Sequence, residues 1–114
     1  MEMKIGDLAR ATGVNPRLLR YYEEQGLLVS YRLSSGHRRY ASDAPVVVGH
    51  IRTLLAAGLS TNVIRAVLPC VEGPGPELHA CVADTLQEQL RGLDERITVL
   101  QDARTTLAGL LPTG

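Results

Sequence analysis

The chain is 114 residues long, has a formal net charge of zero and is 45% hydrophobic, which suits one ordinary domain or a small domain with an appended helix. It contains no apolar run near the roughly 18 residues of a membrane span, and its first residues, MEMKIGDLAR, lack the long apolar stretch of a signal peptide. These features argue against a membrane partner and predict a cytoplasmic protein.

The zero net charge is an average over unlike parts of the chain. Residues 1–42 carry seven Lys or Arg against four Asp or Glu, whereas residues 72–114 carry three against seven. A basic front and an acidic rear favour a polyanionic partner for the N-terminal part.

The first 26 residues carry the signals of two short helices joined by a tight turn. Apolar residues recur at steps of three and four over residues 5–12, and Gly13 can adopt the left-handed conformation that ends a helix. Asn15 is a favoured N-cap, Pro16 suits the first helical position, and Gly26 ends the second helix. This order predicts a helix-turn-helix.

Residues 27–40 change to an extended pattern. The segments LLVSY and HRRY lie on either side of a short turn at residues 33–36, which contains a glycine. The pattern predicts a β-hairpin, which is called a wing when it follows a helix-turn-helix.

Two further helices are predicted behind the hairpin. Ser42 and Asp43 are expected to cap the first of them, and Gly58 to terminate it. Ser60 is expected to cap the second, which Pro69 stops. These two helices should close the core over the first two.

The rest of the chain predicts a loop and one long helix. Residues 69–76 hold three prolines and two glycines, so we expect a DNA-binding domain at 1–70, a connecting loop at 71–76 and a helix at 77–111 that is about 50 Å long. Its apolar residues alternate in steps of four and three, interrupted only by Arg104, and this pattern is the seam of a coiled coil. Nothing else in the chain is long enough to cover them, which favours a homodimer. The expected dimerisation residues are Leu86, Leu90, Leu93, Ile97, Leu100 and Leu107.

Cations and tyrosines on the second helix could contact DNA. Arg17, Arg20 and Tyr21 share one helical face, where arginines can reach phosphates or a guanine edge. Leu18 and Tyr22 are expected to turn largely toward the core, although the Tyr22 hydroxyl is also a candidate phosphate donor. Taken alone, this face could equally be a solvated basic surface.

The hairpin supplies a second basic element. His37, Arg38 and Arg39 lie in it, so two basic elements follow each other in helix-turn-helix and wing order. This order suits one DNA duplex, with a helix in the major groove and a wing on the flanking backbone. The fold class predicted is therefore mainly α: a winged helix-turn-helix domain followed by a long dimerisation helix.

Three stretches of the sequence carry a family resemblance. The run IGDLARATGVNPRLLRYYEEQGLL, followed by SGHRRY and LLAAGLS, resembles the MerR family of bacterial transcription regulators. The resemblance covers residues 4–68 closely, and residues 77–111 resemble the family's dimerisation helix in kind. It implies a dimer that is joined through an antiparallel coiled coil and binds a pseudo-palindromic promoter operator.

The resemblance also implies a mechanism and DNA-contact residues. Such dimers distort an overlong promoter spacer, so that RNA polymerase is affected indirectly through the DNA. Arg20, Tyr21 and Arg38 match family positions that contact DNA. The neighbouring candidates are Arg17, Tyr22, His37 and Arg39.

The loop is flanked by Cys70, His79 and Cys81, and three roles are open for these residues. They could hold a soft ion such as Zn(II), Cu(I) or Hg(II), the two thiols could form a redox disulfide, or both cysteines could be small buried apolar residues. Metal-sensing MerR members resemble this chain in having a cysteine near the start of the dimerisation helix. They usually complete the site with later cysteines, which this sequence lacks.

Two rival functions keep the same fold. One is a protein-interaction module that uses the coiled coil to bind a different protein, and the other is a constitutive DNA-architectural factor without an effector. The sequence contains no nucleophile-base pair, phosphate-binding loop or paired carboxylate motif, so no enzyme activity is expected.

Overall fold

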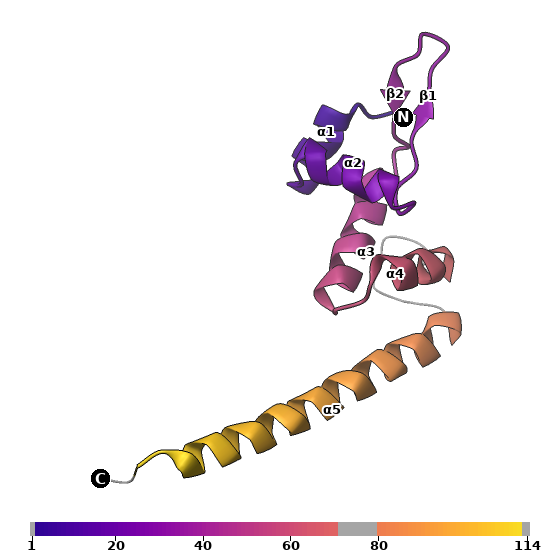
Figure 1. Cartoon of the computed structure of the whole chain (residues 1–114). Helices are drawn as coiled ribbons and strands as arrows, with labels where there is room; N and C mark the ends of the chain where they lie inside the picture. The colour runs from indigo at the N-terminus through magenta and orange to yellow at the C-terminus, as the bar shows by residue number, and fades with distance from the viewer. Residues whose placement is uncertain (1, 71–79, 113–114) are drawn as a thin grey trace. The chain divides into compact units, whose positions relative to one another are not determined.

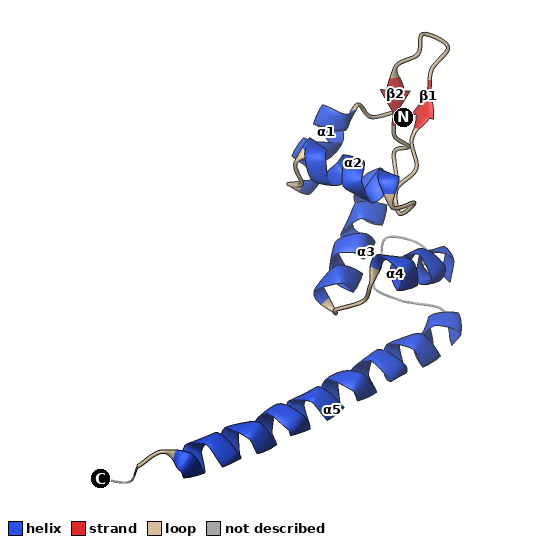
Figure 2. Cartoon of the chain, in the orientation of Figure 1, coloured by secondary structure: helices blue, strands red, loops and turns tan. Residues whose placement is uncertain are grey.

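The computed structural model describes residues 2–70 and 80–112, and the side chains of residues 2–69 and 83–112. The chain divides into two compact units, Met1–His79 and Ala80–Gly114. In the residues described, the first unit contains helices α1 to α4, a β-hairpin and a short 3-10 turn, and the second contains the single helix α5 (Figures 1 and 2).

Helix α1, Ile5–Thr12, has the predicted bounds. The backbone N–H of Lys4 donates to Asp7 Oδ2 at 3.3 Å, which satisfies a donor at the start of the helix. Gly13 follows with a φ of 73°, the left-handed conformation predicted for it. Leu8 points into the core and is fully buried.

Helix α2, Pro16–Glu24, also begins and ends where the sequence predicts. Asn15 Oδ1 accepts a hydrogen bond from the backbone N–H of Leu18 at 2.8 Å, so Asn15 is the N-cap, and Pro16 opens the first turn. Gly26, with a φ of 75°, turns the chain out of the helix. The tight connection between α1 and α2 is thus a helix-turn-helix.

The wing is a hairpin of two very short strands. Strand β1, Tyr31–Arg32, pairs antiparallel with β2, Arg38–Arg39, and the backbone N–H of Gly36 donates to Leu33 O at 2.8 Å to close the predicted turn. Tyr40 then exchanges two backbone hydrogen bonds of 2.8 Å with Met3. The strands are shorter than predicted because the apolar pair at residues 27–28 is buried in the core and lies outside the ladder.

Helices α3, Ala44–Ala56, and α4, Thr61–Val67, follow the wing, and a 3-10 turn, Leu68–Cys70, comes after α4. Ser60 Oγ accepts from the backbone N–H of Val63 at 3.2 Å, so the predicted cap of α4 is confirmed.

The predicted side-chain cap of α3 is wrong. Asp43 precedes the helix, but its side chain makes no capping hydrogen bond, because its backbone is already helical, with φ −87° and ψ 0°. The backbone N–H groups of Val46 and Val47 are satisfied instead by the carbonyl oxygen of Asp43, at 3.0 and 3.2 Å. Pro45 has no N–H group to satisfy.

Two arginines from the later helices bind the C-terminal ends of the helix-turn-helix. Arg52 of α3 donates through Nη1 to the carbonyl oxygen of Thr12 at 3.4 Å, and Arg65 of α4 donates through Nε to that of Gln25 at 2.7 Å. A cation at a helix C-terminus is favourable because the last carbonyl groups carry partial negative charge. These contacts hold α1 and α2 against the helices behind them.

The core of the first unit draws on every helix and on the segments around the wing. Its burial provides the main stabilisation of the fold. In the part of the chain that the structure describes, no buried side-chain nitrogen or oxygen lacks a hydrogen-bond partner. The buried hydrophobic residues are Leu8, Val14, Leu19, Tyr22, Leu27, Leu28, Tyr40, Ala44, Val48, Ile51, Leu54, Leu59, Ile64 and Val67.

Helix α5, Ala80–Leu110, is 31 residues long, which corresponds to about 46 Å. The predicted start at residue 77 lies outside the described residues, and the end agrees with the prediction within one residue. None of the helices described is both long and apolar enough to cross a membrane.

Candidate nucleic-acid interface

The outer face of α2 presents polar and basic side chains to solvent. Arg17, Arg20 and Glu24 are exposed, and Tyr21 is 44% exposed. The N-cap at Asn15 and the left-handed Gly26 fix the start and end of the helix, and therefore which residues face outward. This face combines two cations and a phenol that can donate hydrogen bonds to phosphate oxygens.

The opposite face of α2 anchors the helix in the core. Leu19 is fully buried and Tyr22 is only 2% exposed, whereas Leu18 is exposed, which corrects the expectation that it turns inward. Burial raises the pKa of Tyr22, and the nearby Arg52 opposes part of that rise. Because its side chain is enclosed, Tyr22 is not part of the exposed face of α2.

The wing carries the other predicted cations. His37 is exposed at the turn, Arg38 is also exposed, and Arg39 is half-buried and donates through Nη1 to Arg38 O at 3.0 Å. The structure adds Arg32, a cation that the sequence analysis did not single out. Arg32 lies directly opposite Arg38 in the ladder. Opposing residues share one face of a hairpin, so the register of the two strands would have revealed it.

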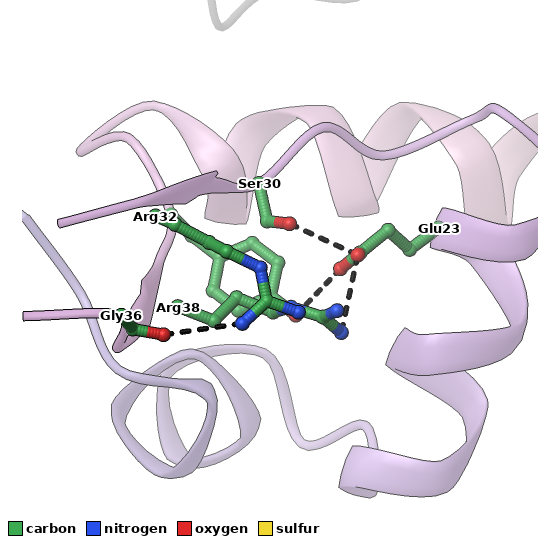
Figure 3. A network of polar contacts seen from close by, with 6 residues as sticks. Glu23, Ser30, Arg32, Gly36 and Arg38 are labelled. Atoms are coloured by element: carbon green, nitrogen blue, oxygen red, sulfur yellow. Dashed lines mark hydrogen bonds and ion pairs between the residues drawn. The ribbon is translucent and has the colours of Figure 1, made fainter. Parts of the chain in front are cut away.

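Arg32 and Arg38 make different contacts. Arg32 Nη1 donates to the carbonyl oxygen of Gly36 at 3.1 Å, which ties its side chain to the turn of the wing. Arg38 Nη1 forms an ion pair with Glu23 Oε2 of α2 at 3.2 Å (Figure 3).

Glu23 also accepts two hydroxyl hydrogen bonds. Ser30 Oγ donates to Oε2 at 2.9 Å, and Tyr40 Oη donates to Oε1 at 2.8 Å. Tyr40 is fully buried, and burial, this hydrogen bond and the charge of Glu23 raise the pKa of Tyr40 to about 12 against the weaker influence of Arg38. We call Glu23, Ser30, Arg38 and Tyr40 the Glu23 network.

The side chains of the predicted thiol site lie outside the described part of the chain. His79 lies outside the described residues, as do the side chains of Cys70 and Cys81, while the backbone of Cys70 is in the 3-10 turn and that of Cys81 in α5. Among the residues described, no group of three or more His, Cys, Asp or Glu could hold a metal ion.

Most of the predicted dimerisation residues of α5 are exposed in the single chain. Leu100, for example, is 67% exposed, and Leu90, Ile97 and Leu107 are each more than half exposed. Leu86 and Leu93 are half-buried.

Two short helices around a tight turn, a following hairpin and cations on both elements define a winged helix-turn-helix domain, a class of DNA-binding domain. Comparison with known families agrees: a family model described as "MerR HTH family regulatory protein" matches residues 3–69. The chain therefore belongs to the MerR family.

Individual relatives match most of this chain. It is 44% identical over 113 residues to an HTH-type transcriptional activator SoxR homolog of Chromobacterium violaceum, covering 96% of this chain and 74% of the relative. It is 41% identical over 105 residues to nodulation protein NolA of Bradyrhizobium elkanii, covering 91% of this chain and 42% of that protein. The chain thus spans about two fifths of the length of the NolA proteins that it matches.

A solved structure shares the fold over nearly the whole chain. HiNmlR, described as a MerR family regulator lacking the sensor domain and bound to promoter DNA, has a TM-score of 0.60 with this chain and 20% sequence identity. The match covers 95% of this chain and 89% of HiNmlR. At this identity the likeness concerns the fold.

Proposed function

We propose that the chain binds a pseudo-palindromic promoter operator as a homodimer, with α2 in the major groove and the wing on the flanking backbone. The observation that carries this proposal is the exposed set Arg17, Arg20 and Tyr21 on α2, in the same compact unit as the basic wing. Cations on two elements of one unit suit two parts of one duplex. HiNmlR, which shares the fold, is described as bound to promoter DNA, and this supports a DNA partner for the chain.

The dimer forms through α5. An apolar stripe with four-and-three spacing on an exposed helix of 31 residues is the pattern of a coiled coil, and a second copy of α5 covers it in antiparallel orientation. Two DNA-binding units in one symmetric dimer match the two halves of a pseudo-palindrome.

The dimer controls transcription by stabilising a distorted promoter. Deforming DNA costs energy that depends on the sequence deformed, and the contacts of two units repay it. RNA polymerase responds to the altered spacing of the promoter elements and needs no contact with the regulator.

The proposed response to an effector concerns the residues around the connecting loop. Cys70, His79 and Cys81 respond to a soft metal ion or to an oxidant, unless both cysteines serve only as small apolar residues. Promoter output with Zn(II), Cu(I), Hg(II) or an oxidant, compared between wild type and Cys70→Ser with Cys81→Ser, distinguishes these roles. An unchanged response in the double variant would rule out thiol sensing.

DNA binding is tested with a duplex of about three helical turns, chosen by the protein itself from a random-sequence pool and called here the selected duplex. Arg20→Ala removes an exposed cation of α2, so we expect binding about tenfold weaker and a salt slope reduced in magnitude by about 1. Titrations at several salt concentrations measure both quantities.

The matched control is Arg91→Ala, which removes one cation from α5, where Arg91 pairs with Glu88 on the surface. It should bind the selected duplex as wild type does. If Arg20→Ala also binds like wild type, α2 does not read DNA, and the protein-interaction function is favoured.

A further inference from the structure

The Glu23 network joins the recognition helix to the wing. Its acceptor, Glu23, lies in the last turn of α2, and its three donors come from the segment that forms the wing (Figure 3). Ser30 immediately precedes β1, Arg38 lies in β2, and Tyr40 immediately follows β2. One carboxylate therefore binds the base of the hairpin on both sides.

The hairpin needs such an anchor. Each strand has two residues, and an isolated two-stranded hairpin is at best marginally stable in water. The Glu23 side chain is only 19% exposed, so its contacts are partly shielded from water and stronger than those of a surface pair. The Glu23 network is therefore one of the contacts that connect the wing to α2, beside the buried Tyr40 and its backbone hydrogen bonds to Met3.

The ion pair leaves Arg38 able to meet DNA. A guanidinium carries five N–H donors in a planar fork, and 39% of the Arg38 side chain is exposed. Arg38 can thus stay paired with Glu23 through one edge and donate to a phosphate oxygen through another.

We propose that Glu23 is a positioning residue, which sets the wing and its Arg38 against α2 so that both elements meet the same duplex. The inference rests on the proposed DNA binding. The proposal predicts that removing the negative charge of Glu23 weakens DNA binding. Simple electrostatics predicts the opposite, because removing a negative charge near DNA should strengthen binding.

The first test compares Glu23→Gln with Glu24→Gln on the selected duplex. Both variants remove one negative charge from α2, but Glu24 is exposed and outside the Glu23 network. We expect Glu23→Gln to bind about tenfold more weakly, with a salt slope reduced in magnitude by about 1, and Glu24→Gln to bind at least as tightly as wild type. Stronger binding by both variants would overturn the proposal.

A double-mutant cycle tests whether Glu23 acts through Arg38. We expect Arg38→Ala to weaken binding, and Glu23→Gln to add less than about threefold in the Arg38→Ala background. A full, additive loss in the double variant would mean that Glu23 affects binding by another route.

Thermal melting by circular dichroism shows whether each variant is folded at the assay temperature. If Glu23→Gln is unfolded at that temperature, Ser30→Ala is used in its place. Ser30→Ala removes only the half-buried hydroxyl that donates to Glu23 Oε2. We expect Ser30→Ala to weaken binding by about threefold, and wild-type affinity would contradict the proposal.

Arg20→Ala distinguishes a failure of the Glu23 role from a failure of DNA binding itself. If Arg20→Ala loses affinity while Glu23→Gln binds like wild type, DNA binding stands and the role of Glu23 falls. If the wild-type protein selects no duplex, the proposed function itself falls.

Discussion

Tyr40 illustrates how a single buried side chain can set the pH dependence of stability. Its hydroxyl is enclosed and donates to Glu23, and its pKa is raised from the ordinary 10.0 to about 12. The folded chain therefore holds this proton more tightly than the unfolded chain does. The resulting stabilisation is complete below pH 10 and is lost as the pH rises toward 12.

We predict that the free energy of unfolding of the wild-type protein falls between pH 10 and 12, and that Tyr40→Phe removes a large part of that fall. At pH 8, Tyr40→Phe should already be less stable by about 1 kcal/mol, because the hydrogen bond to Glu23 is lost. Urea unfolding at several pH values, followed by circular dichroism, measures both effects.

Tyr21→Phe is the control, since Tyr21 is 44% exposed. It should keep the stability of the wild type at pH 8 and the same fall above pH 10. An equal fall in Tyr40→Phe would mean that other groups cause it.

The sequence predicted which charged and tyrosine side chains of α2 are exposed better than it predicted the contacts that residues make with each other. The exposed positions of Arg17, Arg20 and Tyr21 follow from helical spacing, which is local information. The pairing of Glu23 with Tyr40 joins residues 17 positions apart and depends on how the hairpin folds back on α2, so spacing alone could not predict it.

Two glycines that end helices have the same backbone conformation but different surroundings. Gly13 and Gly26 have similar φ values, 73° and 75°, at the ends of α1 and α2. A Cβ at Gly13 would meet nothing within 4 Å, whereas one at Gly26 would lie 3.1 Å from Arg65 Nε. Arg65 is the side chain that binds the C-terminal carbonyl of α2.

We predict that Gly13→Ala lowers the free energy of unfolding by about 1–2 kcal/mol, the cost of a left-handed alanine. Gly26→Ala should cost more, because the new Cβ also pushes on Arg65 Nε, which donates to Gln25 O. Urea unfolding followed by tyrosine fluorescence reports on this unit, since residues 21, 22, 31 and 40 are the only tyrosines in the chain.

Arg65→Ala supplies the internal check. In that background the two glycine variants should cost the same, because the extra contact at Gly26 is gone. A persistent difference would place the additional cost of Gly26→Ala elsewhere.

Helix ends were the most predictable part of the fold. Asn15, Ser60 and the two glycines act on neighbouring backbone groups, so their roles can be read from short stretches of sequence. The predictions of a side-chain cap at Asp43 and of longer strands were wrong. Backbone hydrogen bonds form the start of α3, and core packing takes residues 27–28 out of the hairpin.

The apolar stripe of α5 is the surface on which the proposed dimer depends. We predict that Leu93→Glu with Ile97→Glu yields a monomer, because charges at the seam would be buried in the dimer without partners. The monomer should bind the selected duplex much more weakly, since one unit then contacts one half-site. Analytical ultracentrifugation gives the mass.

Thr98→Glu with Thr105→Glu adds the same two charges one position after the seam, where they face outward. This control should remain a dimer with wild-type affinity. A wild-type mass for the seam variant would refute the coiled coil.

If α5 dimerises as proposed, its composition makes the lifetime of the protein depend on its concentration. The helix contains Gly92 and Gly109, each of which costs about 1 kcal/mol of helix stability, and its leucines gain little while they remain in water. In the proposed dimer, the helix is stabilised by its partner, so the fraction of ordered α5 rises with protein concentration. Scarce chains would then be the preferred substrates of proteases, and the lifetime of the regulator would increase with its abundance.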